Sequence, residues 1–140
     1  MQGTLLDSSV YIPELRGSGS EATTSRFLGP DSPVWLSAVV LEELYAGAAN
    51  NDRRVVERLE RDFRNAGRIL VPSLADWVQT GLVLSKLAAR YGYEQIGRSR
   101  LTNDALIAVS AGRCAFVLVT ANERDFGRIA EFRAFSWRLA

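Results

Sequence analysis

Six polar residues stand at the ends of apolar segments or within helical patterns, where their side chains could do chemistry. They are Asp7, Glu42, Glu43, Asp104, Thr120 and Asn122. Asp7 directly follows a short strand pattern over 3–6, and Thr120 and Asn122 follow the apolar run 116–119. Carboxylates of like charge repel one another unless a divalent cation lies between them. A cluster of these acids would suit a metal-assisted displacement at phosphorus, in which the cation activates water and offsets charge on the phosphate oxygens.

Each acid also has a purely structural interpretation. Asp7 could cap the helix that follows it. Asp104 opens a helix expected over 102–111, where it would complement the helix macrodipole by about 0.3–1 kcal/mol. The segment 105–109 is nearly all apolar, so we also expect Asp104 to lie in a recess where a carboxylate needs a counter-charge or a metal. One of Glu42 and Glu43 should face solvent, and periodicity alone does not decide which.

The composition excludes several kinds of chemistry. The chain contains no histidine and a single cysteine, Cys114. These absences exclude Ser-His-Asp and Cys-His catalysis, zinc bound by His or thiolates, and a disulfide framework. Carboxylates, hydroxyls, Lys and Arg remain, and hard oxygen ligands favour Mg²⁺ or Mn²⁺. We expect Cys114 to be a buried structural thiol.

Charge and targeting signals are less informative. The net charge is +1, with sixteen Arg and one Lys, which argues neither for nor against nucleic acid. Arg binds phosphate through a bidentate fork, but most of these side chains could simply be solvated. The sequence shows no signal-peptide pattern and no apolar run long enough to span a membrane, so we expect a cytoplasmic protein with no membrane contact.

Short apolar runs alternate with longer helical patterns. Strands are expected at 3–6, 33–36, 69–71, 116–119 and 134–139, and helices at 8–15, 21–28, 37–49, 53–66, 73–91, 102–111 and 122–129. The helix over 73–91 should bury an apolar stripe of Leu74, Trp77, Val78, Leu84, Leu87 and Ala88. This alternation predicts a single α/β domain over residues 1–140, with a central, mostly parallel sheet of about five strands and helices on both faces. In such a sheet a functional site lies at the carboxyl ends of the strands.

Four segments resemble the motifs of PIN domains, in order and at matching spacing. They are residues 5–12 around Asp7, 36–48 around Glu43, 104–108 beginning at Asp104, and 119–126 around Asn122. The resemblance covers residues 4 to about 138 and selects Glu43 over Glu42. It implies the PIN-like three-layer fold.

PIN domains are known for metal-dependent RNA cleavage. The resemblance therefore implies an Mg²⁺- or Mn²⁺-dependent endoribonuclease, with Asp7 and Asp104 as metal ligands and Glu43 as a ligand or water-positioning base. A compact PIN domain of this length looks like the VapC-type toxins of type II toxin–antitoxin pairs. That likeness implies an RNA substrate, a cognate antitoxin as partner, and a homodimer.

The fourth motif departs from the family. Many relatives have an acid where Asn122 stands, and an amide keeps an oxygen but loses the charge. We expect Asn122 to act through a hydrogen bond or a water. Asp125 could supply the missing charge or cap the short helix at Phe126. Thr120 could orient a carboxylate through its hydroxyl or serve as a structural cap.

Partner surfaces are also expected. Arginines in loops or at helix starts could face RNA phosphates: Arg16, Arg26, Arg98, Arg100 and Arg124. The helices over 39–49 and 53–66 carry apolar residues such as Leu44, Tyr45 and Leu59. These could form an antitoxin groove if they are exposed, or simply pack the core.

Other functions fit less well. A receiver domain needs a Lys after its last strand, and the only lysine is Lys86 within a helical pattern. A haloacid-dehalogenase-type phosphatase needs Asp-x-Asp after the first strand, where this chain has Asp7-Ser8-Ser9. The main alternative is a PIN-like module that binds RNA or protein without cutting, since Asn122 replaces an acid.

Overall fold

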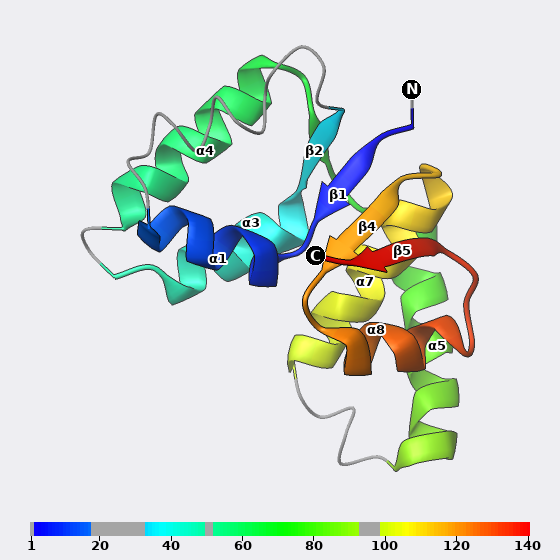
Figure 1. Ribbon diagram of the computed structural model, residues 1–140. Coiled ribbons are helices and arrows are strands. Elements are labelled where there is room, and N and C mark those ends of the chain that lie inside the picture. The colour runs from blue at the N-terminus through cyan, green and yellow to red at the C-terminus, as the bar shows by residue number, and fades with distance from the viewer. Residues whose placement is uncertain (1, 18–32, 50–51, 93–98) are drawn as a thin grey trace.

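A five-stranded parallel sheet forms the centre of the computed structural model, which describes residues 2–17, 33–49, 52–92 and 99–140 (Figure 1). The strands are β1 (Thr4–Leu6), β2 (Val34–Ser37), β3 (Ile69–Leu70), β4 (Val117–Thr120) and β5 (Ser136–Leu139). Their order is β3-β2-β1-β4-β5, and every neighbouring pair is parallel. The predicted α/β class and strand number are confirmed.

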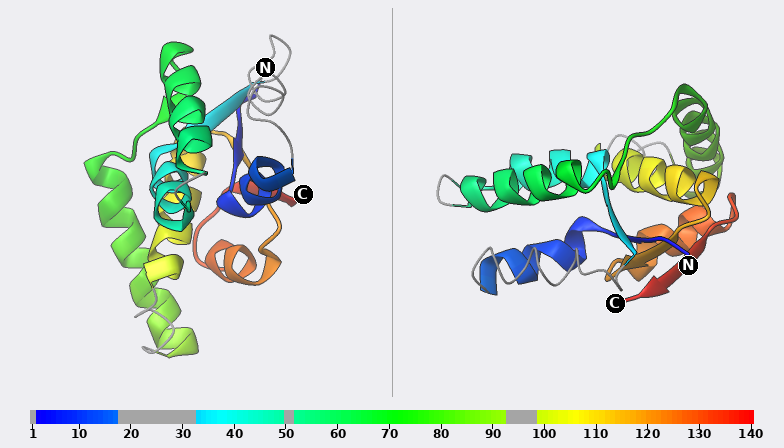
Figure 2. Two further views of the ribbon diagram at one scale, coloured as in Figure 1. Left: turned by 90° about the vertical axis from the view of Figure 1, so that its left-hand side faces the viewer. Right: turned by 90° about the horizontal axis from the view of Figure 1, so that it is seen from above.

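Helices cover both faces of this sheet. They are α1 (Ser8–Gly17), α3 (Ala38–Gly47), α4 (Arg53–Asn65), α5 (Leu74–Tyr91), α7 (Ser99–Arg113) and α8 (Glu123–Ala130). Figure 2 shows α1 and α8 on one side of the strands and α3, α4, α5 and α7 on the other. The helix expected over 21–28 lies outside the described residues. None of the helices in the described parts of the chain is long and apolar enough to cross a membrane.

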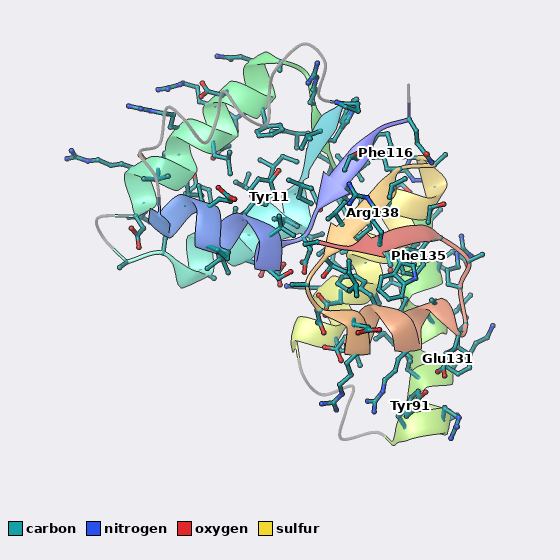
Figure 3. All side chains as sticks on the ribbon, viewed as in Figure 1. Tyr11, Tyr91, Phe116, Glu131, Phe135 and Arg138 are labelled. Atoms are coloured by element: carbon teal, nitrogen blue, oxygen red, sulfur yellow. The ribbon has the colours of Figure 1, made fainter. Side chains whose placement is uncertain are left out.

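The core forms because the central strands are apolar on both faces. Leu5, Leu36 and Leu118, one from each of three adjacent strands, are fully buried. Tyr11 points from α1 into the interior and is also fully buried (Figure 3). Continuous apolar runs are typical of parallel strands covered by helices on both sides.

Local sequence signals begin the helices that carry the site. Ser37 caps α3 by accepting a 3.1 Å hydrogen bond from the Val39 N–H. Ser73 and Asp76 form the capping box that the sequence predicts for α5. The buried Asp76 carboxylate also accepts from Arg113 Nε at 2.9 Å, which ties the start of α5 to the end of α7.

The predicted apolar stripe of α5 is wrong over its first half. Leu74, Trp77 and Val78 are 81%, 54% and 54% exposed. The face that packs inward carries Asp76, Thr80, Val83, Leu87 and Ala88. The capping box and the Arg113 contact turn Asp76 inward, and Leu74, Trp77 and Val78 consequently point outward.

The predicted start of α7 is also wrong. This helix begins at Ser99 instead of near Thr102, and no acid lies in its first turn. Asp104 is therefore the sixth residue of the helix. Because the macrodipole acts mainly within the first turn, it does not account for a buried acid at this position.

Candidate metal site

The pairing of β1 with β4 places Asp7 beside Thr120. Leu6 lies opposite Val119 in the parallel register, and the Asp7 N–H donates to the Val119 carbonyl at 3.0 Å. One position further on, Thr120 Oγ1 donates to Asp7 Oδ2 at 2.9 Å. Both residues are buried, at the carboxyl ends of the two central strands.

A second hydroxyl reaches the same carboxylate oxygen. Ser9 Oγ donates to Asp7 Oδ2 at 2.8 Å. Ser9 was missed by the sequence reasoning. The signal was available, because serines directly after a strand-end acid lie in the first turn of α1 and can fold back on it. Ser8 Oγ also lies 3.5 Å from Asp7 Oδ1.

Asn122 joins Asp104 to the same cluster. Its backbone N–H donates to Thr120 Oγ1 at 2.9 Å, so Thr120 acts as a local cap and also contacts Asp7. The Asn122 amide nitrogen lies 3.3 Å from Asp104 Oδ2 and 3.1 Å from Asp125 Oδ2. Asn122, not Asp125, is the N-cap of α8, and its Oδ1 accepts from the Asp125 N–H at 3.4 Å.

Glu43 lies on α3 beside Asp7, and Glu42 is exposed. The Glu43 side chain accepts hydrogen bonds from Ser8 and Asn103, while Glu43 Oε1 is buried without a hydrogen-bond partner among the described residues. Burial, and next the negative charge of Asp7, raise the pKa of Glu43 to about 6. Asn103 Nδ2 also lies 3.5 Å from Glu42 Oε2.

The side chains fit a hard divalent cation by chemistry. Their donors are carboxylate oxygens, which Mg²⁺ and Mn²⁺ prefer. Asp7 and Asp104 are buried acids, and the unpartnered Glu43 Oε1 is an oxygen that a cation would satisfy. As they stand, the described residues hold no ready-made group of three or more acids or thiols for an ion. A magnesium ion is usually held by only one or two carboxylates and keeps several of its waters.

A pocket opens next to Glu43, between α1, α3 and α4. It is lined by Ile12, Leu15, Glu43, Leu44, Gly47, Ala48, Asp52 and Val56. Of the two alternatives for Leu44, Tyr45 and Leu59, an exposed groove or core packing, the structure favours core packing. Leu44 and Leu59 are buried, and Tyr45 is half-buried with its hydroxyl donating to Glu60. Leu44 alone of these three lines the pocket.

The expected RNA-contacting arginines are only partly described. Arg124 is exposed in the first turn of α8, next to Asn122. Arg16 and Arg100 lie at the end of α1 and near the start of α7. Arg26 and Arg98, with the side chains of Arg16 and Arg100, lie outside the described part of the chain.

Residues 4–132 match the PIN domain. Because this match spans most of the 140 residues, the chain belongs to the PIN domain family. No curated protein sequence matches the chain.

Solved structures of toxin–antitoxin complexes share the fold. A chain of DNA-bound VapBC from Salmonella typhimurium is 24% identical with a TM-score of 0.69, covering 99% of this chain and 98% of that one. A chain of VapBC2 from Rickettsia felis, bound to a promoter DNA fragment, is 22% identical with a TM-score of 0.64, covering 98% of each. A chain of VapBC-5 from Mycobacterium tuberculosis is 27% identical with a TM-score of 0.56, covering 99% and 98%.

The raised pKa of Glu43 has a consequence for stability. Its folded-state pKa of about 6 exceeds the ordinary glutamate value of 4.5, so protonation stabilises the folded state. That stability is present below pH 4.5 and is lost as pH rises through about 6. The shift corresponds to roughly 2 kcal/mol, reduced to about 1 kcal/mol because Glu43 is partly exposed.

Urea unfolding of the wild type and Glu43→Gln in EDTA tests this. The variant should be more stable than the wild type by about 1 kcal/mol at neutral pH, and the difference should vanish near pH 4. Glu42→Gln, an exposed change on the same helix, is the matched control. An equal difference at both pH values would contradict the assignment.

Proposed function

We propose that this chain is an Mg²⁺- or Mn²⁺-dependent endoribonuclease that hydrolyses RNA phosphodiester bonds in the cytoplasm, as the toxin of a type II toxin–antitoxin pair. The observation that carries the proposal is a continuous hydrogen-bonded path from Asp7 through Thr120 and Asn122 to Asp104. Glu43 lies beside one end of this path. Membership of the PIN domain family and the likeness to VapBC and FitAB complexes support it.

The proposed roles of the acids differ because their surroundings differ. Asp7 and Asp104 are the proposed metal ligands because both are buried acids at the carboxyl edge of the sheet. A bound cation would activate water and offset charge on the phosphate oxygens. Glu43 Oε1 either binds the ion or accepts a proton from the attacking water, since a carboxyl with a pKa of about 6 is mostly ionised at neutral pH.

Asn122 and Asp125 have supporting roles in this proposal. An ionised carboxylate can only accept hydrogen bonds, so the Asn122 amide nitrogen must face Asp104 and Asp125. Asn122 therefore orients Asp104 by hydrogen bonding. Asp125 accepts a hydrogen bond from the same amide at the start of α8, and its proposed role is to contribute negative charge near the site. Arg124 is exposed in the same turn, and its proposed role is to contact an RNA phosphate.

The pocket between α1, α3 and α4 is the proposed docking site of the antitoxin. Its walls are mainly apolar, and its two charged lining residues, Glu43 and Asp52, are both acids. These features fit a partner segment that inserts apolar side chains and a Lys or Arg. Because Glu43 belongs to both pocket and site, an occupant would restrain catalysis directly.

The exposed face of α5 is the proposed homodimer interface. Val71, Leu74, Trp77, Val78 and Leu82 are between 53% and 81% exposed. The only charged residue from Leu74 to Ser85 is Asp76, which is buried. Such a face can pair with its own copy across a two-fold axis without like-charge repulsion.

Cleavage of a mixed tRNA and rRNA pool tests the nuclease. With Mg²⁺ or Mn²⁺ the purified protein should give discrete fragments, and EDTA should abolish them. Asp104→Ala and Asp104→Asn should each lower the rate by about 100-fold or more, because a metal contributes several kcal/mol to the transition state. Ser110→Ala, which removes a buried hydroxyl further along α7, should leave the rate unchanged.

The alternative in this experiment is a non-catalytic PIN module. Asn122 in place of an acid and the absence of a ready-made group of three acids among the described residues favour it. RNA or partner binding that survives Asp104→Ala, without any metal-dependent cleavage, would establish this alternative instead.

Co-expression with a candidate antitoxin, the product of a small reading frame adjacent to this gene, tests the antitoxin pocket. The two proteins should purify together, and the complex should cleave RNA at least about tenfold more slowly than the free chain. Ile12→Arg, which places a charge on the apolar wall, should weaken the complex. Asn65→Arg, which adds the same charge at an exposed position on α4 that does not line the pocket, is the matched control. Equal binding by both variants would show that the partner docks elsewhere.

Light scattering at micromolar concentration tests the dimer. The wild type should have the mass of two chains, and Trp77→Glu should have the mass of one, because the new carboxylate would be buried without a partner. Asn65→Glu, an exposed change of equal charge on α4, should stay dimeric. A Trp77→Glu dimer would exclude this face as the interface.

A further inference from the structure

The hydroxyl of Ser9 lies between the first turn of α1 and the β4–α8 turn. It accepts a hydrogen bond from the Ala121 N–H at 3.0 Å and donates to Asp7 Oδ2 at 2.8 Å. Thr120 has the same arrangement: its Oγ1 accepts from the Asn122 N–H and donates to Asp7 Oδ2, both at 2.9 Å. Each hydroxyl thus accepts a hydrogen bond from a backbone N–H and donates one to the same carboxylate oxygen, Asp7 Oδ2.

The direction of these hydrogen bonds follows from the groups involved. A backbone N–H can only donate, so both hydroxyls accept from the turn and have one proton left. The Ser9 and Thr120 oxygens lie 3.4 Å apart, farther than either lies from Asp7 Oδ2. An ionised carboxylate is also the stronger acceptor. Both protons are therefore directed at Asp7.

The two oxygens of Asp7 are consequently not equivalent. Among the described residues, Oδ2 receives two short hydrogen bonds, whereas Oδ1 has only the 3.5 Å contact with Ser8 Oγ. Oδ1 is the oxygen with capacity for a further ligand.

We propose that Ser9 is a positioning residue that, with Thr120, occupies Asp7 Oδ2 and so makes Asp7 a one-oxygen ligand through Oδ1. Ser9 also fixes Asp7 to the turn that leads to Asn122, so Asp7 and the amide that orients Asp104 keep one relative placement. This inference rests on the proposed metal-dependent function.

Calorimetric titration with Mn²⁺, without RNA, measures how much Ser9 contributes to metal affinity. Ser9→Ala should weaken Mn²⁺ binding about tenfold or more, as loss of a group that orients a ligand typically does. Ser9→Thr keeps the hydroxyl and should bind within about threefold of the wild type. Ser110→Ala, which removes a buried hydroxyl that bonds only to helix carbonyls in the described structure, should bind as the wild type does.

Thermal unfolding in EDTA separates positioning from folding. Ser9→Ala and Ser110→Ala should both unfold cooperatively, with Mn²⁺ affinity reduced in Ser9→Ala alone. Unchanged Mn²⁺ affinity in Ser9→Ala, or equal losses in both variants, would overturn the positioning role and leave the proposed function standing. A wild type that binds no Mn²⁺ would overturn the proposed function and this inference with it.

Discussion

The pairing of β1 with β4 is the constraint on which the site depends. The strands are central and buried, and a shift of one residue would move every side chain of a strand to the opposite face of the sheet. Because Leu6 lies opposite Val119, the next residues, Asp7 and Thr120, meet at the carboxyl edge. The first turn of α1, after β1, brings Ser9 to the Asp7 carboxylate, and the turn after β4 brings Asn122 to Thr120.

The same constraint concentrates negative charge. Asp7 and Asp104 are almost fully buried, and Glu43 is desolvated enough for its pKa to rise to about 6. Such an arrangement lowers stability unless the carboxylates are compensated. Among the contacts that the described residues make, neutral donors stabilise these acids: the Ser9 and Thr120 hydroxyls donate to Asp7, and the Asn122 amide donates to Asp104.

Much of this architecture could be predicted because the strands and most helices have strong local signals. Continuous apolar runs marked β1 and β4, and Ser37 and Ser73 marked the starts of α3 and α5. The buried face of α5 could not be predicted. That helix is apolar on two sides, and the choice between them depends on Asp76 meeting Arg113, 37 residues later in the chain.

Single contacts across the fold decided the details of the site in the same way. Periodicity could not separate Glu42 from Glu43, since the difference is the position of Asp7 and Ser8, where β1 leads into α1. Nor could the sequence show that Asn122 would lie between two acids. A carboxylate at 122 would stand within hydrogen-bond distance of two others and repel both. The amide instead donates to both Asp104 and Asp125, so a neutral group links these two acids at a position where a third carboxylate would repel them.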